Sequence, residues 1–183
     1  MKRDDLRRIF AQARSLSSET DYVVFGSLAA LGYAGQVPPR MAMSVDVDAY
    51  GRSDPARIFA LAHALGQGSP FEAEHGYYLD PISPRIATLP AGWEDRLVRI
   101  ELEPGLAAWF LEPNDAAVSK YARIEPRDRE WIRAGLRVGI LSLAIIEARF
   151  KQTVFLDADE SERARKALDE DRKALRAKRP RGR

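Results

Sequence analysis

Apolar residues in the first fifty positions follow two different periods. Residues 1–16 repeat apolar side chains at helical spacing, which predicts a first helix. Residues 22–25 form a continuous apolar run that stops at Gly26, which predicts a buried strand followed by a sharp turn. Residues 28–33 predict a short helix, and residues 44–48 alternate strictly between polar and apolar side chains. The predicted order is therefore helix, strand, turn, short helix, strand.

The rest of the chain mixes short strands with longer helices. The remaining elements are expected as a helix over 56–65 with an N-cap and an early proline in residues 53–55, strands over 77–79, 97–102 and 107–111, and a helix ending near residue 121. A helix opening at residue 127, an apolar segment over 136–150 that is one helix or two separated near 139–142, and a charged helix from residue 157 are expected to follow. This order predicts an α/β (α+β) fold, in which a small mixed sheet is flanked by helices and followed by a C-terminal helical extension.

The length of 183 residues favours one domain over residues 1–150, followed by a charged helical tail over 151–183 with a disordered end. The absence of cysteine excludes disulfides, thiol nucleophiles and cysteine-based zinc sites. The sequence contains no apolar run of about 18 residues, so no membrane span is predicted, and the first residues lack the apolar centre of a signal peptide. These features predict a cytoplasmic protein.

The net charge of +2 is unevenly distributed. The last 27 residues, 157–183, hold ten Arg and Lys against seven Asp and Glu, so they carry +3 and the body carries −1. A nearly neutral body does not predict a large surface for nucleic acid, which needs many positive charges. The basic end could bind RNA or an acidic partner, or could simply be solvated.

Two short motifs suggest phosphate chemistry. Gly26 allows a sharp turn, and Ser27 stands where a hydroxyl would cap the following helix, whose free N–H groups could bind an anion. Asp46 and Asp48 are two residues apart on a predicted strand, so their carboxylates share one face. Two like charges at this distance repel unless a cation lies between them, and carboxylates suit Mg²⁺. The sequence therefore predicts a phosphate site beside a metal site.

Gly26 and Ser27 followed by Asp46 and Asp48 resemble the signature of nucleotidyltransferases with the polymerase-beta-like fold. Over residues 20–140 the chain resembles the small bacterial proteins related to AbiEii toxins, including the domain family of unknown function 6036. The further points of resemblance are Arg40 and Ser44, the segment 89–93, Lys120, and the pair Arg127 and Asp128. The order and spacing of these residues carry the resemblance, because each short motif alone is common.

The resemblance implies an active site and its ligands. Asp46 and Asp48 would hold Mg²⁺ or Mn²⁺, Gly26 and Ser27 would hold the triphosphate of a nucleoside triphosphate (NTP), and a third carboxylate would come from a later strand. Glu101 is the positional candidate, although a solvated residue paired with Arg99 is an equal alternative. Lys120 would neutralise phosphate charge, and Asp128 would orient Lys120 or assist the attacking group. The alternative is a solvated lysine and a first-turn aspartate that interacts with the helix dipole.

The implied reaction moves a nucleoside monophosphate from an NTP to an acceptor, which would be RNA, tRNA in particular, or a protein. The AbiEii resemblance also implies a toxin with a cognate antitoxin partner. One alternative is a noncatalytic module of the same fold that binds a nucleotide or a protein. Another is an antitoxin-like or scaffold protein that uses its charged tail.

Overall fold

The computed structural model describes residues 1–33 and 35–178 and is built on one mixed sheet. The strands are β1 (Asp21–Val24), β2 (Asp46–Gly51), β3 (Tyr78–Pro81), β4 (Val98–Glu103) and β5 (Leu106–Phe110). Their order across the sheet is β3-β2-β1-β5-β4. Strand β1 is parallel to β5 and antiparallel to β2, β2 is parallel to β3, and β4 is antiparallel to β5. The expected small mixed sheet is confirmed.

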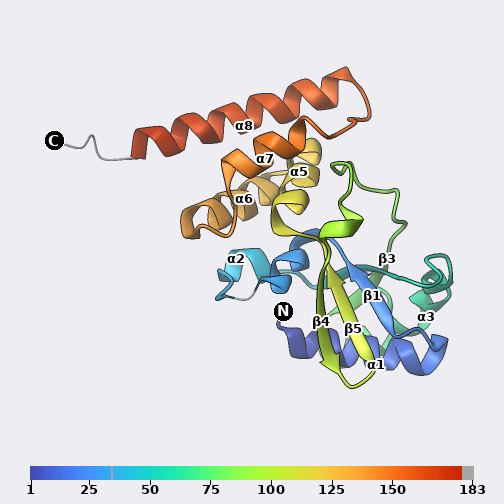
Figure 1. The fold of residues 1–183 in the computed structure, drawn as a ribbon. Coiled ribbons are helices and arrows are strands. Elements are labelled where there is room, and N and C mark those ends of the chain that lie inside the picture. The colour runs from blue at the N-terminus through green and yellow to red at the C-terminus, as the bar shows by residue number, and fades with distance from the viewer. Residues whose placement is uncertain (34, 179–183) are drawn as a thin grey trace.

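Helices cover this sheet and extend beyond one end of it. The helices are α1 (Arg3–Ser17), the 3₁₀ helix η1 (Gly26–Gly32), α2 (Pro39–Ala42), the 3₁₀ helix η2 (Arg57–Leu61), α3 (Ala62–Leu65), α4 (Pro70–His75), the 3₁₀ helix η3 (Glu94–Arg96), α5 (Pro113–Arg123), α6 (Pro126–Val138), α7 (Leu143–Phe150) and α8 (Ala158–Lys178). In Figure 1, α1 lies below the strands and α5 to α8 form a separate group above them. In the described part of the chain, no helix is long and apolar enough to cross a membrane.

Two expected helical segments are each divided in the structure. The segment expected as one helix over 56–65 is the 3₁₀ helix η2 followed by one turn of α-helix in α3. Ser53 does not cap it, because its backbone N–H and hydroxyl both donate to Glu19, while Asp54 accepts from the N–H of Ala56 at 3.1 Å. The apolar segment over 136–150 is divided at Gly139, which ends α6 with φ 77°. Of the two alternatives for that segment, two helices is therefore correct.

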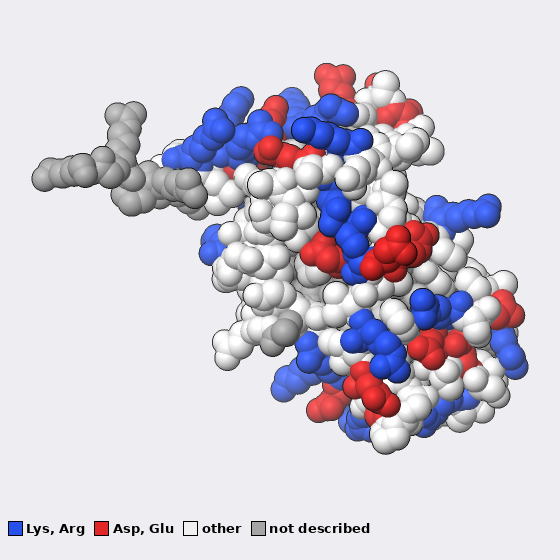
Figure 2. Space-filling model, viewed as in Figure 1, with Lys and Arg blue, Asp and Glu red and all other residues white. Residues whose placement is uncertain are grey.

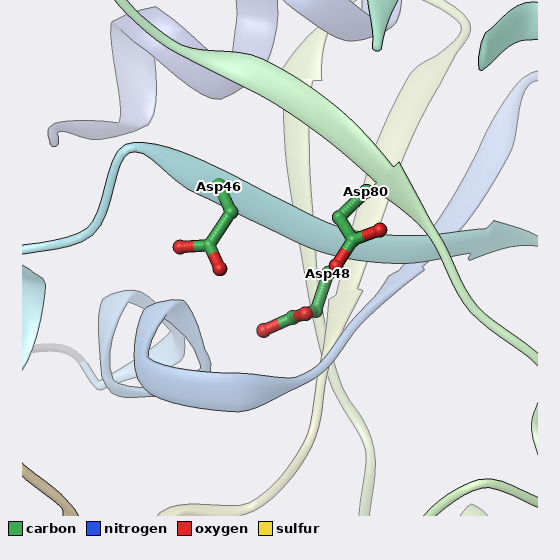
Figure 3. A group of neighbouring side chains, drawn as sticks. All are labelled: Asp46, Asp48 and Asp80. Atoms are coloured by element: carbon green, nitrogen blue, oxygen red, sulfur yellow. The ribbon is translucent and has the colours of Figure 1, made fainter. Parts of the chain in front are cut away.

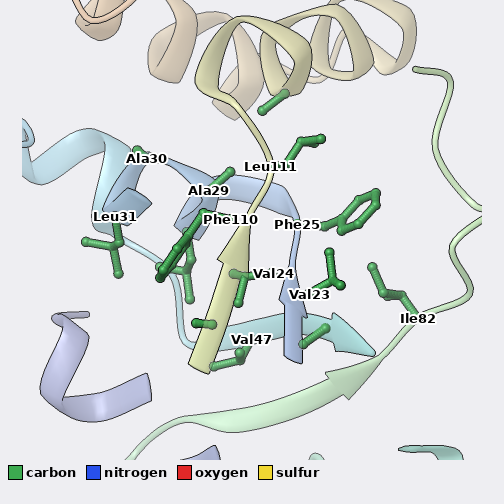
Figure 4. Packing of buried hydrophobic residues seen from close by; sticks show 14 of the residues in the cluster. Val23, Val24, Phe25, Ala29, Ala30, Leu31, Val47, Ile82, Phe110 and Leu111 are labelled. Atoms are coloured by element: carbon green, nitrogen blue, oxygen red, sulfur yellow. The ribbon is translucent and has the colours of Figure 1, made fainter. Parts of the chain in front are cut away.

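The hydrophobic core joins the sheet to the turn after β1. Side chains of β1, β5 and η1 pack together with Val47 of β2, as Figure 4 shows. The buried stack of Phe10 on Tyr22, with ring centroids 4.4 Å apart, fixes α1 against the sheet. This packing holds the ends of β1 and β2 in a fixed relation, and the candidate site lies at those ends.

Helix α8 packs on the C-terminal helices despite its many charges. Ala164, Ala167 and Leu168 are buried in the interface, as is Asp171. Asp171 accepts from Tyr121 of α5 at 3.0 Å and from Arg133 of α6 at 2.9 Å. In the tail, residues 158–178 therefore form a packed helix after the turns and loop of residues 151–157, whereas residues 179–183, at the end expected to be disordered, lie outside the described residues.

Candidate functional site

Three carboxylates from two adjacent strands meet at one end of the sheet. In the parallel register of β2 and β3, Asp48 lies opposite Asp80 and Asp46 lies opposite Tyr78. Paired residues of neighbouring strands project to the same face, so all three carboxylates share it. One oxygen from each lies within 4.8 Å of the others, and Figure 3 shows the three side chains projecting to one side of the sheet. Ser44 donates to Asp46 and so orients that carboxylate.

The third carboxylate is Asp80 and not the expected Glu101. Glu101 is on β4 at the opposite edge of the sheet, with β1 and β5 between β4 and β2. Its side chain is exposed and accepts from the N–H of Gly105 at 3.3 Å. Glu101 is therefore exposed, as the alternative expected, although the described residues show no ion pair between it and Arg99. Asp80 lies directly after the strand expected over 77–79 and follows the buried Leu79, so it projects to the opposite face of β3, which is the face shared by Asp46 and Asp48.

Gly26 brings the turn after β1 against the Asp48 side chain. Its φ of 62° lies in the left-handed region, where other residues are strained. A Cβ at this position would overlap the Asp48 carboxylate and lie 2.9 Å from its Cγ. The backbone N–H of Phe25 also donates to the carbonyl oxygen of Asp48 at 2.9 Å. Both the conformation and the close approach therefore require glycine.

Ser27 is in the site, but it does not cap a helix as expected. The following segment is the 3₁₀ helix η1, which begins at Gly26 and has no side-chain cap. The Ser27 hydroxyl instead accepts from Lys120 Nζ of α5 at 3.2 Å. Trp131 of α6 is also bound to this turn, because its indole N–H donates to the Ser27 carbonyl at 3.1 Å. The turn is thus joined to two helices more than ninety residues away.

Lys120 and Asp128 form a buried ion pair, and Arg123 also binds Asp128. Lys120 Nζ donates to Asp128 Oδ1 at 2.8 Å, with exposed side-chain fractions of 4% and 0%. Arg123 donates to both oxygens of Asp128 at 2.9 Å. Burial alone would raise the pKa of Asp128, but the hydrogen bonds and charges of Arg123 and Lys120 lower it. Asp128 therefore stays ionised, and the ion-pair trio of Lys120, Arg123 and Asp128 carries a net charge of +1.

A cavity of about 460 Å³ connects the carboxylates to the helices. Its lining residues are Phe25, Gly26, Asp48, Asp80, Ile82, Ile86, Ala87, Thr88, Leu111, Ala116, Ser119, Ala122, Arg123 and Glu160. Gly26 and two of the carboxylates therefore line the same space as Arg123, a residue that sequence reasoning missed. Lys120 is behind this wall and contacts Ser27. The helical spacing of Lys120 and Arg123, three residues apart, was the signal that could have identified Arg123.

The electrostatics of the site favour a bound cation. Burial, together with the negative charges of Asp46 and Asp80, raises the pKa of Asp48 to about 6, against the opposing effect of the charges of Lys120 and Arg123. Burial and the charge of Asp46 likewise raise the pKa of Asp80. Oxygen ligands crowded in this way are typical of Mg²⁺ sites in proteins. The donor set therefore fits a hard divalent cation.

The raised pKa of Asp48 predicts a specific pH dependence of the free energy of unfolding. Without metal, the Asp48 carboxylate binds a proton more tightly in the folded state than in the unfolded chain, where its pKa is near 3.8. The contribution of Asp48 is therefore most favourable below about pH 4 and is lost as the pH rises to about 6. A shift of this size corresponds to a loss on the order of 2–3 kcal/mol above pH 6.

Denaturant unfolding in EDTA from pH 4.5 to 8, with Asp48→Asn as the comparison, measures this contribution. We expect the variant to be more stable than the wild type at pH 7.5 and to lose that advantage toward pH 4.5. Mg²⁺ should stabilise only the wild type, and chiefly above pH 6. A difference between the two proteins that does not change with pH would contradict the assigned environment of Asp48.

Comparison with known families assigns the chain to one of them. A family model described as "Nucleotidyltransferase of unknown function (DUF6036)" matches residues 4–176. The chain belongs to this family. The match includes all three carboxylates, the Gly26 turn, the ion-pair trio and most of α8. No curated protein and no solved structure gave a match.

Membership in the DUF6036 family agrees with the mixed sheet and its flanking helices, which are compatible with a nucleotidyltransferase-like fold. The family description supports nucleotidyltransferase activity in general. It does not extend to AbiEii toxins, so the toxin role and the antitoxin partner remain predictions. The structure brings together Gly26, Ser27, Asp46, Asp48, Lys120 and Asp128, and excludes Glu101 from this group.

Proposed function

We propose that the protein transfers a nucleoside monophosphate from an NTP to an acceptor hydroxyl, with a divalent metal ion held by Asp46, Asp48 and Asp80. The observation that carries this proposal is the meeting of three carboxylates beside the Gly26 turn, with Gly26 and two of the carboxylates, Asp48 and Asp80, in the wall of one cavity. The bond from the α-phosphorus to the acceptor oxygen would form as the bond to pyrophosphate breaks. Nearly all of the catalysis in such a transfer is positioning and charge neutralisation.

The carboxylates are the residues that would bind the metal ion, Mg²⁺ or Mn²⁺. When bound, such an ion supplies positive charge that neutralises the phosphates and activates the acceptor oxygen. Without it, Asp48 is enclosed beside two other negative groups, which is why its pKa is raised to about 6. The hydroxyl of Ser44 orients Asp46 within this set.

The cations of α5 have different roles in this proposal. Arg123 lines the cavity and its side chain is half exposed, so it is the group placed to neutralise triphosphate charge. Lys120 is nearly fully buried and would act through Ser27, whose hydroxyl it contacts. Asp128 fixes both cations through three hydrogen bonds. In this proposal Asp128 orients the two cations, and Arg123, in place of Lys120, contacts the phosphates.

The remainder of the cavity suits the base and sugar of a nucleotide. Phe25, Ile82, Ile86 and Leu111 give it apolar walls, which favour an aromatic base. Thr88 and Glu160 lie in the same lining and supply polar groups for hydrogen bonds. The carboxylate of Glu160 would repel phosphate, so the nucleotide should bind with its phosphates toward Gly26 and Arg123.

The test is transfer from α-labelled ATP, CTP, GTP and UTP with Mg²⁺, supplied with total bacterial RNA and with protein acceptors. We expect Asp80→Asn to lower the transfer at least 100-fold, as removal of one metal ligand in a two- or three-carboxylate site should. Glu101→Gln is the matched control, because the same change in charge is made on the far edge of the sheet. It should leave transfer within twofold of the wild type, since it removes no group from the site.

Two results would contradict the proposal. Loss of transfer in Glu101→Gln with full activity in Asp80→Asn would show that the wrong carboxylate has been assigned. Binding of nucleotide without transfer to any acceptor would instead support the alternative of a noncatalytic module of this family.

A further inference from the structure

A second hollow opens directly beside the nucleotide cavity. This groove has a volume of about 760 Å³ and is lined by Pro84, Arg85, Ile86, Ala87, Thr88, Leu89, Trp93, Glu94, Val154, Phe155, Leu156 and Glu160. Four of these residues, Ile86, Ala87, Thr88 and Glu160, also line the cavity. A molecule in the groove could therefore extend a group into the space where the transferred phosphate would lie.

Two loops form the groove, and hydrogen bonds join them. Ala91 donates its N–H to the carbonyl of Gln152 at 2.9 Å, next to an antiparallel bridge between Pro90 and Thr153. Glu160 accepts from the Thr88 hydroxyl at 3.1 Å and from the backbone N–H of Leu156 at 2.7 Å. The groove is thus a built feature of the fold, because backbone and side-chain contacts fix its walls.

Three large apolar side chains that line the groove are exposed. Val154, Leu156 and Ile86 have exposed fractions of 91%, 84% and 68%. Trp93 adds a partly buried ring that packs edge-on against Phe25, with centroids 5.3 Å apart, so the groove and the cavity share an aromatic wall. Contiguous exposed apolar residues on a small protein mark an interaction site.

The charges of the groove disfavour RNA as its occupant. The lining holds one cation, Arg85, against the carboxylates of Glu94 and Glu160, for a net charge of −1. RNA carries a negative charge at every nucleotide and binds surfaces that neutralise several phosphates. On the face shown in Figure 2, Lys and Arg side chains gather over α8, mixed with acidic side chains. Apolar contacts and slight negative charge instead suit a protein segment, particularly one that carries a basic residue.

We propose that this groove binds the acceptor, and that the acceptor is a protein segment with apolar residues close to a Ser, Thr or Tyr hydroxyl. The inference rests on the proposed transferase function, because it names the acceptor of that reaction. The apolar side chains would lie against Val154, Leu156 and Ile86. The hydroxyl would enter the cavity past Thr88 and Glu160. Its oxygen would bond to the α-phosphorus of the NTP as the bond to pyrophosphate breaks, and its proton would pass to water.

A peptide array measures the binding step without requiring catalysis. The array holds synthetic 12-residue peptides with one hydroxyl residue each, half with Leu, Ile or Phe within three positions of it and half with Gly or Asn there. We expect the labelled full-length protein to bind the apolar set. Val154→Ser/Leu156→Ser should weaken that binding at least about tenfold, as the loss of two apolar contacts predicts. Val138→Ser, at an exposed position on α6 outside the groove, should not weaken it.

The transfer step is measured on the same array and on bacterial tRNA, with α-labelled NTPs and Mg²⁺. Label on apolar peptides that is reduced in Val154→Ser/Leu156→Ser supports the proposal. Equal binding of both peptide sets, equal binding by the double variant, or label on tRNA alone overturns it. So does a dimer in sedimentation that dissociates in the double variant, since a second copy would then cover the groove. If the double variant still binds nucleotide, these results count against the proposed acceptor groove and not against the proposed transferase function.

Discussion

Asp128→Asn is expected to lower the free energy of unfolding by about 3–5 kcal/mol, the usual cost of removing one partner from a buried ion pair. The substitution preserves the shape of the side chain but removes its charge. Lys120 would then be left nearly fully buried without its ion-pair partner, and Arg123 would keep only its longer contact with Glu125, at 3.8 Å. Transfer activity should fall as well, because Arg123 would lose the two hydrogen bonds that orient it.

Glu125→Gln is the matched control for this substitution. Glu125 precedes Asp128 at the start of α6 and contacts Arg127 at 2.9 Å and Arg123 at 3.8 Å, but its side chain is 42% exposed, whereas that of Asp128 is buried. Its removal should cost less than about 1 kcal/mol, as is usual for surface ion pairs. The double variant Lys120→Met/Asp128→Asn should recover at least half of the lost stability in denaturant unfolding. Equal costs for Asp128→Asn and Glu125→Gln would mean that Asp128 only interacts with the helix dipole.

Gly26→Ala is expected to abolish transfer, with a loss of at least 100-fold, and to destabilise the fold by about 1–3 kcal/mol. The alanine Cβ would require a left-handed backbone and would overlap the Asp48 carboxylate. Because β2 is fixed within the sheet, the carboxylate would have to move away from Asp46 and Asp80. Metal binding and transfer should therefore fail together.

Gly105→Ala separates the two effects in Gly26→Ala. Gly105 has a φ of 72°, close to that of Gly26, but a Cβ there would meet no atom within 4 Å. This variant should show the cost of the backbone conformation alone, about 1–2 kcal/mol, and should keep full activity. Thermal unfolding and NTP transfer assays of both variants make the comparison. Full activity in Gly26→Ala would contradict the close approach of the turn to Asp48.

The sequence predicted the elements around the site because their patterns are local. The alternation of residues 44–48 predicted that Asp46 and Asp48 lie on one face of a strand, and they lie on one face of β2. The break in the apolar run at Gly26 located the turn, whose φ of 62° only glycine adopts easily. These inferences required only the period of a strand and the steric freedom of one residue.

The third carboxylate could not be predicted because it depends on strand order. Asp80 and Glu101 both follow the acidic strand in the sequence, and both lie on short strands. Only the pairing of β3 with β2, at the opposite edge from β4, decides between them. Strand order depends on contacts far apart in the chain, so the alternation of side chains gives no information about it.

The partners of Ser27 were also beyond local reasoning. A serine after a strand and before a helical run is typical of an N-cap, yet η1 begins one residue earlier. Its hydroxyl contacts Lys120, which is 93 residues later in the chain. The packing of α5 and α6 onto the turn brings these residues together, through contacts such as that of Trp131 with the Ser27 carbonyl.

The most direct test of the metal site is a titration with Mn²⁺, read by electron paramagnetic resonance, in the presence of a nonhydrolysable NTP analogue. Wild type and Glu101→Gln should bind Mn²⁺ equally. Asp48→Asn and Asp80→Asn should each bind it at least about tenfold more weakly, a difference of about 1.4 kcal/mol. Binding that is unchanged in Asp80→Asn but weakened in Glu101→Gln would contradict the assignment of Asp46, Asp48 and Asp80 as the metal site.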